Sequence, residues 1–227
     1  MTASPNHDAR PVVGAIDMLV LHYTGMISAE AALARLCDPE AKVSAHYMID
    51  EDGVLFPLVP EDRRAWHAGV ACWAGQRDIN GCSIGIELVN PGHEFGYCAF
   101  PAPQMKALEK LCHDILARYS IAPHRVLGHS DVAPARKEDP GELFNWQGLA
   151  EMGIGLWPTE ARGVTRRAAR GAGRATADLA QYGYDTERAG LAACATAFQR
   201  HWRPKQIDGV MDNECLGLLA GLHHQKS

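Results

Sequence analysis

Two short apolar runs, Ile16 to His22 and Ser83 to Val89, most constrain the fold of this chain. Each has the length and composition of a strand buried within a sheet. Gly85 leaves room for a close neighbour on the second run. Two longer segments, Ser28 to Cys37 and Pro103 to Tyr119, instead repeat apolar residues at helical spacing, and the first of them begins on a predicted serine N-cap. Strands that alternate with helices predict an α/β domain with a central mixed β-sheet flanked by helices.

Shorter signals complete the sheet. The segments His46 to Asp50 and Val54 to Val59 flank Glu51-Asp52-Gly53, and the Asp-Gly pair predicts a hairpin between two strands. Arg125 to Gly128 predicts a further short strand. These elements fall within residues 1–160, which we interpret as the first domain.

The rest of the chain has a different character. Residues 161–174 carry five arginines among Gly, Ala and Thr, which indicates a solvated linker, although such a run could also bind an anionic polymer. Residues 175–227 predict a small three-helix bundle with helices at about Thr176 to Tyr182, Thr186 to Trp202 and Asp212 to Leu222. A bundle of this size has little core of its own, so we expect it to pack against its neighbour.

Composition excludes several classes of protein. The net charge of −5 argues against binding nucleic acid by bulk attraction, and no apolar run is long enough to span a bilayer. The first twenty residues lack the basic start and apolar core of a signal peptide. The seven cysteines are odd in number and scattered, as in a reducing compartment. We therefore expect a cytoplasmic protein, or a periplasmic one if an export signal has been removed, and a monomer.

Two histidines and one aspartate form a candidate metal site. His22 ends the first apolar run, His129 follows a predicted strand, and Asp139 comes ten residues later, beyond a loop that contains proline. Two imidazoles and one carboxylate are a ligand set of hydrolytic zinc sites, which keep a fourth position open for water. Spacing alone does not require this site, because a lone histidine where a strand meets a loop is more often a hydrogen-bonded structural residue.

The other histidines are weaker candidates. We expect those near the chain ends to be exposed to solvent, namely His7, His201, His223 and His224. His93, His113 and His124 fall in loop or helix-surface contexts where the sequence suggests no partner. For His46 we favour a structural role.

Four segments resemble one enzyme family. They are Val43-Ser44-Ala45-His46-Tyr47, Arg64-Ala65-Trp66-His67-Ala68-Gly69, Ser83-Ile84-Gly85-Ile86-Glu87 and Gly128-His129-Ser130-Asp131 through Asp139-Pro140-Gly141. In this order they resemble the AmpD/AmiD branch of the zinc N-acetylmuramoyl-L-alanine amidases, over about residues 14–158. The tail resembles, over a shorter match, the peptidoglycan-binding-like module that follows AmiD-type catalytic domains. Its signature is Ala197 to Pro204 followed by Ile207-Asp208-Gly209.

The resemblance implies a reaction and its machinery. Zn²⁺ would be held by His22, His129 and Asp139, and the scissile bond would be the amide between the lactyl group of N-acetylmuramic acid and L-alanine of a muropeptide or of peptidoglycan. Glu87 stands where the family has its catalytic glutamate, and Lys137 where it has a lysine that stabilises the oxyanion. The structural alternative for Glu87 is a carboxylate paired at a strand end, and that for Lys137 is a lysine exposed in a charged surface loop.

One position departs from part of the family. Phage-type members carry a catalytic tyrosine just before the histidine that aligns with His46, and this chain has Ala45 there. We therefore expect Glu87 to carry the proton transfer. Tyr47 points to the opposite face of the strand, where a core role is expected.

Candidate substrate contacts follow from the same segments. Trp66 and His67 border the family's groove, where an aromatic face and an imidazole could contact sugar and peptide. Arg64 could pair with a carboxylate of the stem peptide, or simply cover the hairpin. Asn80 could bind a peptide amide, or serve as a turn residue.

Two other functions are alternatives for this sequence. A recognition protein of the same fold would bind peptidoglycan without cutting it, but such a protein would be expected to lack a metal ligand, and this chain has all three. A nucleic-acid role for the arginine-rich tail conflicts with the net acidity, and salt-dependent binding to DNA would be needed to support it.

Overall fold

A five-stranded mixed sheet forms the centre of the first domain, with strand order β4-β3-β6-β2-β7. The computed structural model describes residues 3–11, 16–158 and 172–226. Strands β3, β6, β2 and β7 run parallel to their neighbours, and β4 pairs antiparallel with β3. A small antiparallel pair, β1 with β5, lies apart from it. The strands are β1 His7–Ala9, β2 Met18–Tyr23, β3 Tyr47–Ile49, β4 Leu55–Pro57, β5 Arg63–Ala65, β6 Ser83–Leu88 and β7 Val126–Gly128.

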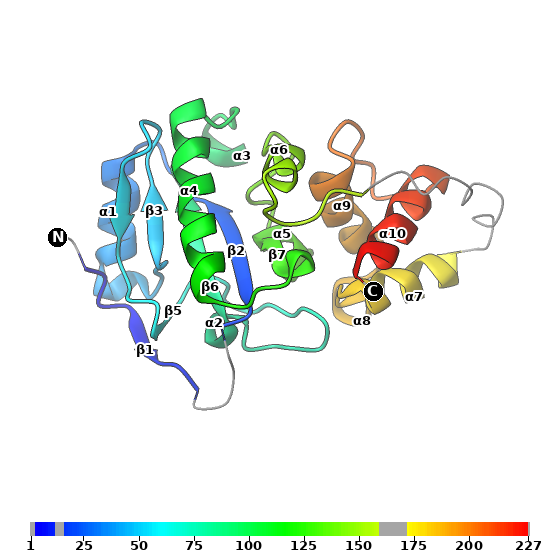
Figure 1. Ribbon diagram of the computed structural model, residues 1–227, viewed down its shortest axis with the longest axis horizontal. Coiled ribbons are helices and arrows are strands. Elements are labelled where there is room, and N and C mark those ends of the chain that lie inside the picture. Colours follow the sequence, from blue (N-terminus) through cyan, green and yellow to red (C-terminus); the bar gives the residue numbers. More distant parts are fainter. Residues whose placement is uncertain (1–2, 12–15, 159–171, 227) are drawn as a thin grey trace.

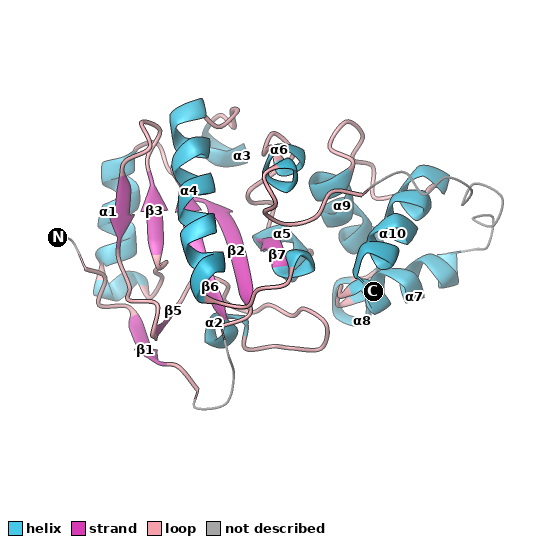
Figure 2. Ribbon diagram, in the orientation of Figure 1, coloured by secondary structure: helices cyan, strands magenta, loops and turns pink. Residues whose placement is uncertain are grey.

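Helices flank this sheet, which confirms the predicted α/β class (Figure 2). Those of the first domain are α1 Ala29–Cys37, η1 Pro39–Ala41, α2 Ile79–Cys82, α3 Gly92–Phe95, α4 Ala102–Arg118, η2 Pro123–Arg125, α5 His129–Val132 and α6 Trp146–Glu151. The described elements of the C-terminal part are all helical: α7 Ala172–Tyr182, α8 Thr186–Ala189, α9 Leu191–Trp202 and α10 Asn213–Lys226.

Strand β2 has two buried faces because helices cover the sheet on both sides. Leu19 and Leu21 pack into a cluster with α4, which crosses the front of the sheet in Figure 1. Met18 and Val20 pack on the opposite side, in a cluster with the C-terminal helices. Side chains alternate between faces along a strand, so His22 lies on the face of Met18 and Val20, away from α4.

Local sequence signals explain two of these elements. Ser28 caps α1 by accepting a hydrogen bond from the backbone N–H of Ala31. The predicted hairpin joins β3 to β4, and Gly53 adopts a φ of +84° in its turn. Both predictions are confirmed.

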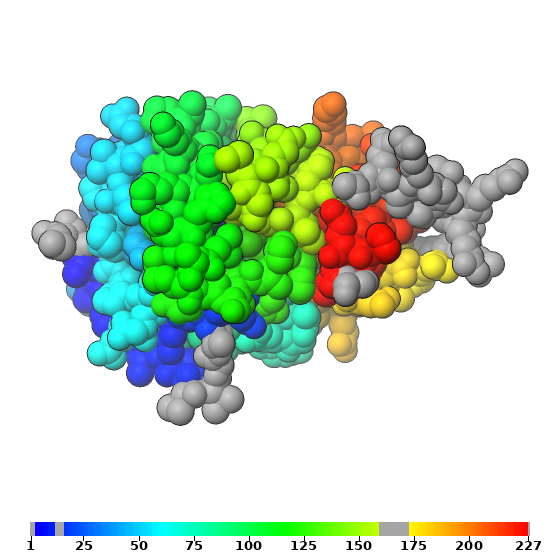
Figure 3. Space-filling view, in the orientation of Figure 1, coloured from blue at the N-terminus to red at the C-terminus, as the bar shows by residue number. Residues whose placement is uncertain are grey.

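The C-terminal helices do not form a separate core. Leu179, Phe198 and Leu219 share one buried cluster with Met18 and Val20 of the central sheet. In Figure 3 the orange and red C-terminal residues lie directly against the green residues of the first domain. This packing confirms the expectation that the small bundle depends on its neighbour.

Two details of that bundle differ from the sequence prediction. The helix expected from Thr186 to Trp202 is broken into α8 and α9, because Gly190 between them adopts a φ of +80°. His201 was expected at the surface, yet it is 2% exposed. Its ring stacks between Trp146 and Trp202, with centroid separations of 3.8 and 3.7 Å.

The signature of the C-terminal module holds its own loop together. The Gln199 side-chain carbonyl accepts hydrogen bonds from the backbone N–H groups of Asp208 and Gly209, at 2.9 and 2.8 Å. Its amide donates to the Asp208 carboxylate and to the carbonyl of Val210. The motif therefore has a structural role in fixing the turn between α9 and α10.

Most of the predicted linker, residues 161–171, lies outside the described residues; residues 172–174 form the first turn of α7. Among the described helices, none combines the length and the apolar character that a membrane span requires.

Candidate metal centre and active-site cavity

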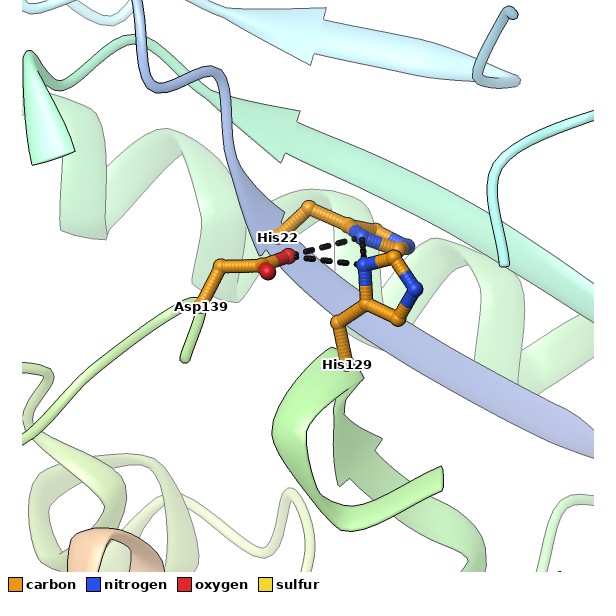
Figure 4. Close-up of side chains that lie close together, drawn as sticks. All are labelled: His22, His129 and Asp139. Atoms are coloured by element: carbon orange, nitrogen blue, oxygen red, sulfur yellow. Dashed lines mark hydrogen bonds and ion pairs between the residues drawn. The ribbon is translucent and has the colours of Figure 1, made fainter. Parts of the chain in front are cut away.

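Three buried side chains meet at the end of β2. His22 is the fifth residue of that strand, His129 is the first residue of α5, and Asp139 lies in the loop that follows (Figure 4). The Nδ1 atoms of the two histidines are 2.9 Å apart, and each lies 3.0 Å from Oδ2 of Asp139. The structure thus brings the predicted triad together, and its donor atoms form a group that could bind a metal ion.

The electrostatics of the triad favour the ligand forms of these groups. Burial, reinforced by the facing His129, lowers the pKa of His22 to about 4. Burial alone would raise the pKa of Asp139, but the two adjacent imidazoles hold it well below its usual range. A neutral imidazole and an ionised carboxylate are the forms that coordinate metal ions.

Second partners orient both imidazoles. Nε2 of His129 lies 3.0 Å from the carbonyl oxygen of Ala68. Because that oxygen can only accept, Nε2 carries the proton and Nδ1 keeps its lone pair for a metal. Backbone carbonyls commonly fix the tautomer of metal-binding histidines in this way.

Behind His22 a chain of hydrogen bonds runs into the protein. Nε2 of His22 donates to Nδ1 of His67 at 3.0 Å, and Nε2 of His67 donates to the Ser83 hydroxyl at 3.0 Å. Ser83 in turn donates to the carbonyl of Ile79 at 2.6 Å. His22, His67 and Ser83 thus each donate one hydrogen bond to the next group in the series. Nδ1 of His22 therefore carries no proton, and its lone pair can coordinate a metal ion.

Gly85 makes room for this chain. A Cβ at that position would overlap the ring of His67, so the ring lies against bare backbone of β6. The close neighbour expected from the sequence is therefore His67. Its pKa is lowered well below the usual value by burial and by the facing His22, so the ring is neutral.

Glu87 lies beside the triad with one oxygen unsatisfied. Its Cα is the register partner of His22 in the parallel pair β2–β6. Among the described residues, no group donates a hydrogen bond to its buried Oε2. Burial raises the pKa of Glu87 well above the usual value, the charge on Asp139 adds to this, and Lys137 opposes it. A carboxylate of raised pKa in a cavity has the properties of a general base.

A cavity of about 570 Å³ opens over these groups. Glu87, His129 and Asp139 lie in its wall together with Lys137, so two of the three candidate ligands and both candidate catalytic residues face one space. Helix α1 and the loop that follows α5 both contribute residues to the wall of the cavity.

The four predicted substrate contacts divide into two pairs. Trp66 and His67 line the cavity, although both ring nitrogens of His67 already have partners. Arg64 does not line it, because its guanidinium pairs with Asp8 and Asp78 at 3.1 and 2.8 Å. Asn80 is buried beneath the wall, where its side-chain oxygen accepts from the backbone N–H groups of His67 and Ala68. These internal partners favour the structural alternatives considered for Arg64 and Asn80, namely a residue that covers the hairpin and a turn residue.

Several cavity residues were not identified from the sequence. Arg35 of α1 and Arg136 bring positive charge to the wall. His93, for which no partner was expected, lies 2.9 Å from the Tyr23 hydroxyl and 3.2 Å from the Glu142 carboxylate. These contacts join residues far apart in the chain, so no local sequence pattern predicts them.

The sequence is similar to those of known amidases. The family model Amidase_2, described as N-acetylmuramoyl-L-alanine amidase, matches residues 12–142. The N-acetylmuramoyl-L-alanine amidase AmiD of Escherichia coli is 39% identical over 231 residues, covering 91% of this chain and 82% of that protein. The 1,6-anhydro-N-acetylmuramyl-L-alanine amidase AmpD of Citrobacter freundii is 34% identical over 160 residues, covering 63% and 83%.

Solved structures of amidases also match the fold of this chain. AmiD from E. coli, in complex with the substrate anhydro-N-acetylmuramic acid-L-Ala-D-γ-Glu-L-Lys, superposes with a TM-score of 0.85 at 35% identity, covering 99% of this chain and 91% of that one. AmpDh3 from Pseudomonas aeruginosa, in complex with anhydromuramic pentapeptide, superposes with a TM-score of 0.86 at 34% identity, covering 96% and 95%.

Proposed function

The chain belongs to the Amidase_2 family of N-acetylmuramoyl-L-alanine amidases, and we propose that it cleaves muropeptides with a zinc ion held by His22, His129 and Asp139. The bond hydrolysed is the amide between the lactyl group of N-acetylmuramic acid and L-alanine of the stem peptide. The observation that carries this proposal is that His129 and Asp139 of the triad share one cavity wall with Glu87, whose Oε2 has no hydrogen-bond partner among the described residues.

The donor set fits zinc in composition and arrangement. Two imidazole nitrogens and one carboxylate oxygen converge, each imidazole with its other nitrogen engaged, as in hydrolytic zinc sites that keep a position open for water. When bound, zinc activates a water molecule and polarises the scissile carbonyl.

Glu87 and Lys137 supply the rest of the chemistry. We assign Glu87 as the base that takes a proton from the attacking water and delivers it to the departing L-alanine nitrogen. The water oxygen adds to the lactyl carbonyl carbon, and the C–N bond then breaks. Lys137 lies in the same wall, where its ammonium can donate a hydrogen bond to the oxyanion that forms on that carbonyl.

The cavity wall and the solved relatives support a muropeptide as the substrate. Stem peptides carry carboxylates, and Arg35 brings a cationic side chain to a wall that also holds four carboxylates. Trp66 adds an aromatic face of the kind that packs on sugar rings. The solved relatives hold anhydromuramyl peptides, which supports assigning this substrate class to the present chain.

Mass spectrometry of the products tests the proposed bond. The substrate is anhydro-N-acetylmuramic acid-L-Ala-D-γ-Glu-L-Lys, and the reaction is run in ¹⁸O-labelled water. One labelled oxygen is expected in the lactyl carboxylate of the sugar product, and none in the released tripeptide. Label in the peptide, or cleavage at any other bond, would overturn the assignment. Parallel assays on intact sacculi measure whether the polymer is also cut.

The finer assignments of organisation and compartment are also proposals. We propose a catalytic domain at residues 1–160, a linker at 161–174 and a peptidoglycan-binding-like helical module at 175–227. We further propose a monomer in a reducing compartment, the cytoplasm, which the seven free thiols support. Light scattering tests the first property, and fractionation of cells that express the native gene tests the second.

A further inference from the structure

Asp131 is a fully buried carboxylate that three groups satisfy. Its Oδ1 accepts from the Tyr184 hydroxyl at 2.6 Å. Its Oδ2 accepts from Nδ1 of His201 at 2.7 Å and from the backbone N–H of Gly128 at 2.8 Å. Tyr184 and His201 belong to the C-terminal part, whereas Gly128 immediately precedes the candidate ligand His129. One carboxylate therefore connects the C-terminal helices to the metal centre.

Asp131 lies in the turn that positions two of the three ligands. The turn is α5, whose first residue is His129. The backbone N–H of the intervening Ser130 donates to the carbonyl of Asp139 at 2.9 Å. A rotation of this turn would therefore move His129 and break the backbone hydrogen bond that holds Asp139.

The two C-terminal donors are themselves held firmly. Tyr184 is 2% exposed and packs edge-on against Trp73 at a centroid distance of 4.9 Å. Burial raises the pKa of Tyr184 well above its usual value, and Asp131 adds to this, so the hydroxyl keeps its proton and donates. His201 is clamped between Trp146 and Trp202.

A second contact joins the same elements at the surface. Arg200 of α9 donates to the carboxylate of Glu138 at 2.7 Å, and Glu138 directly precedes Asp139. Helix α9 therefore contacts the segment that carries two of the candidate ligands at two points. His201 contacts Asp131 in the interior, and Arg200 contacts Glu138 in the cavity wall.

We propose that the C-terminal helical module is part of the metal centre: Tyr184 and His201 act as positioning residues that hold Asp131, and through it the turn carrying His129, in the orientation that binds metal. This inference rests on the proposed metal site. It gives the module a role in the catalytic domain's own chemistry, separate from any binding of peptidoglycan.

The chain offers a matched pair of variants for the test. Tyr182 and Tyr184 are both buried, and both pack edge-on against Trp73. The Tyr182 hydroxyl, unlike that of Tyr184, has no hydrogen-bond partner among the described residues. Tyr184→Phe and Tyr182→Phe therefore each remove one buried hydroxyl, but only the first removes a hydrogen bond to Asp131.

The readout is zinc affinity, measured by competition with a chromophoric chelator on the full chain. Tyr184→Phe is expected to weaken zinc binding by about 10-fold, the lower end of the effect of outer-shell hydrogen bonds, while Tyr182→Phe matches wild type. The d–d absorption of the Co²⁺-substituted protein should change in the first variant alone. Equal affinities and equal spectra in both variants would overturn the proposal.

A second variant keeps the test decisive if Tyr184→Phe folds poorly. His201→Phe retains a ring between the two tryptophans and removes the donor to Asp131, so it should weaken zinc binding in the same way. Wild-type affinity in a folded His201→Phe protein would contradict the proposal. Failure of wild type itself to bind zinc would instead refute the proposed function, so the two failures are distinguishable.

Discussion

His22 and Glu87 are register partners in the parallel pair β2–β6, and both point away from helix α4. Side chains at directly paired positions on one face of a sheet are close neighbours. The sheet thereby fixes the spacing between a candidate metal ligand and the candidate base without help from any loop. His129 and Asp139, in contrast, reach the site from a turn and a loop that are held by hydrogen bonds.

Glu87→Gln should abolish most turnover while leaving the metal in place. The amide has nearly the same shape but cannot accept the proton, so kcat should fall by roughly 10²- to 10⁴-fold, the usual contribution of general acid–base catalysis. Zinc content, measured by elemental analysis, should stay at the wild-type level. Substantial turnover in a zinc-loaded Glu87→Gln protein would exclude Glu87 as the base.

Lys137→Ala should lower kcat with zinc content unchanged. Removing one donor to a developing oxyanion typically costs about 10²- to 10³-fold in kcat. Steady-state kinetics on the muropeptide separate this effect from substrate binding, which appears in KM. Loss of zinc, or unchanged turnover, would remove the oxyanion assignment.

The pH profile should reflect the raised pKa of Glu87. The base works only when ionised, and burial raises the pKa of Glu87 well above the usual 4.5 of a glutamate, so the acid limb of kcat/KM should lie above pH 4.5. Lys137 lowers the pKa of Glu87, so Lys137→Ala should move this limb to higher pH. A limb that moves to lower pH, or stays in place, would contradict the coupling.

His67→Phe should weaken zinc binding although His67 is not a ligand. The phenyl ring can occupy the space over Gly85, but it cannot accept the hydrogen bond from Nε2 of His22. Loss of such an outer-shell partner typically costs about 10- to 100-fold in metal affinity. Chelator competition measures the change, and a circular dichroism spectrum like that of wild type confirms the fold. Unchanged affinity would show that the chain behind His22 does not orient it.

Periodicity and turn residues were sufficient to predict the sheet, α1, α4 and the hairpin at Gly53. They act over a few residues, so the sequence shows them directly. The break between α8 and α9 was not predicted. Gly190 ends the first helix because its φ is positive, and the sequence, which has a helical pattern on both sides of Gly190, does not show that φ.

The candidate site was predictable where motifs define it and not where packing does. The triad was a candidate from its residue types, and the resemblance supported it and identified Glu87 and Lys137. In the structure His129, Asp139, Glu87 and Lys137 line one cavity, and His22 joins His129 and Asp139 in one group of donor atoms. Arg64 lies in one of these motifs and Asn80 just before another, yet both side chains have partners within the protein, and only tertiary contacts reveal this. The burial of His201 depends on Trp146, which is far away in the sequence, and on the adjacent Trp202, so the position of His201 near the chain end was misleading.

Zinc titration of the apo-protein tests the central claim most directly. The chain is stripped with a chelator, and cleavage of anhydro-N-acetylmuramic acid-L-Ala-D-γ-Glu-L-Lys is followed while zinc is returned to wild type and to Glu87→Gln. The apo-protein is expected to show no cleavage and wild type full activity at one equivalent of zinc, whereas Glu87→Gln should bind the same equivalent but stay nearly inactive. Cleavage by the metal-free protein, or by zinc-loaded Glu87→Gln at the wild-type rate, would contradict this claim.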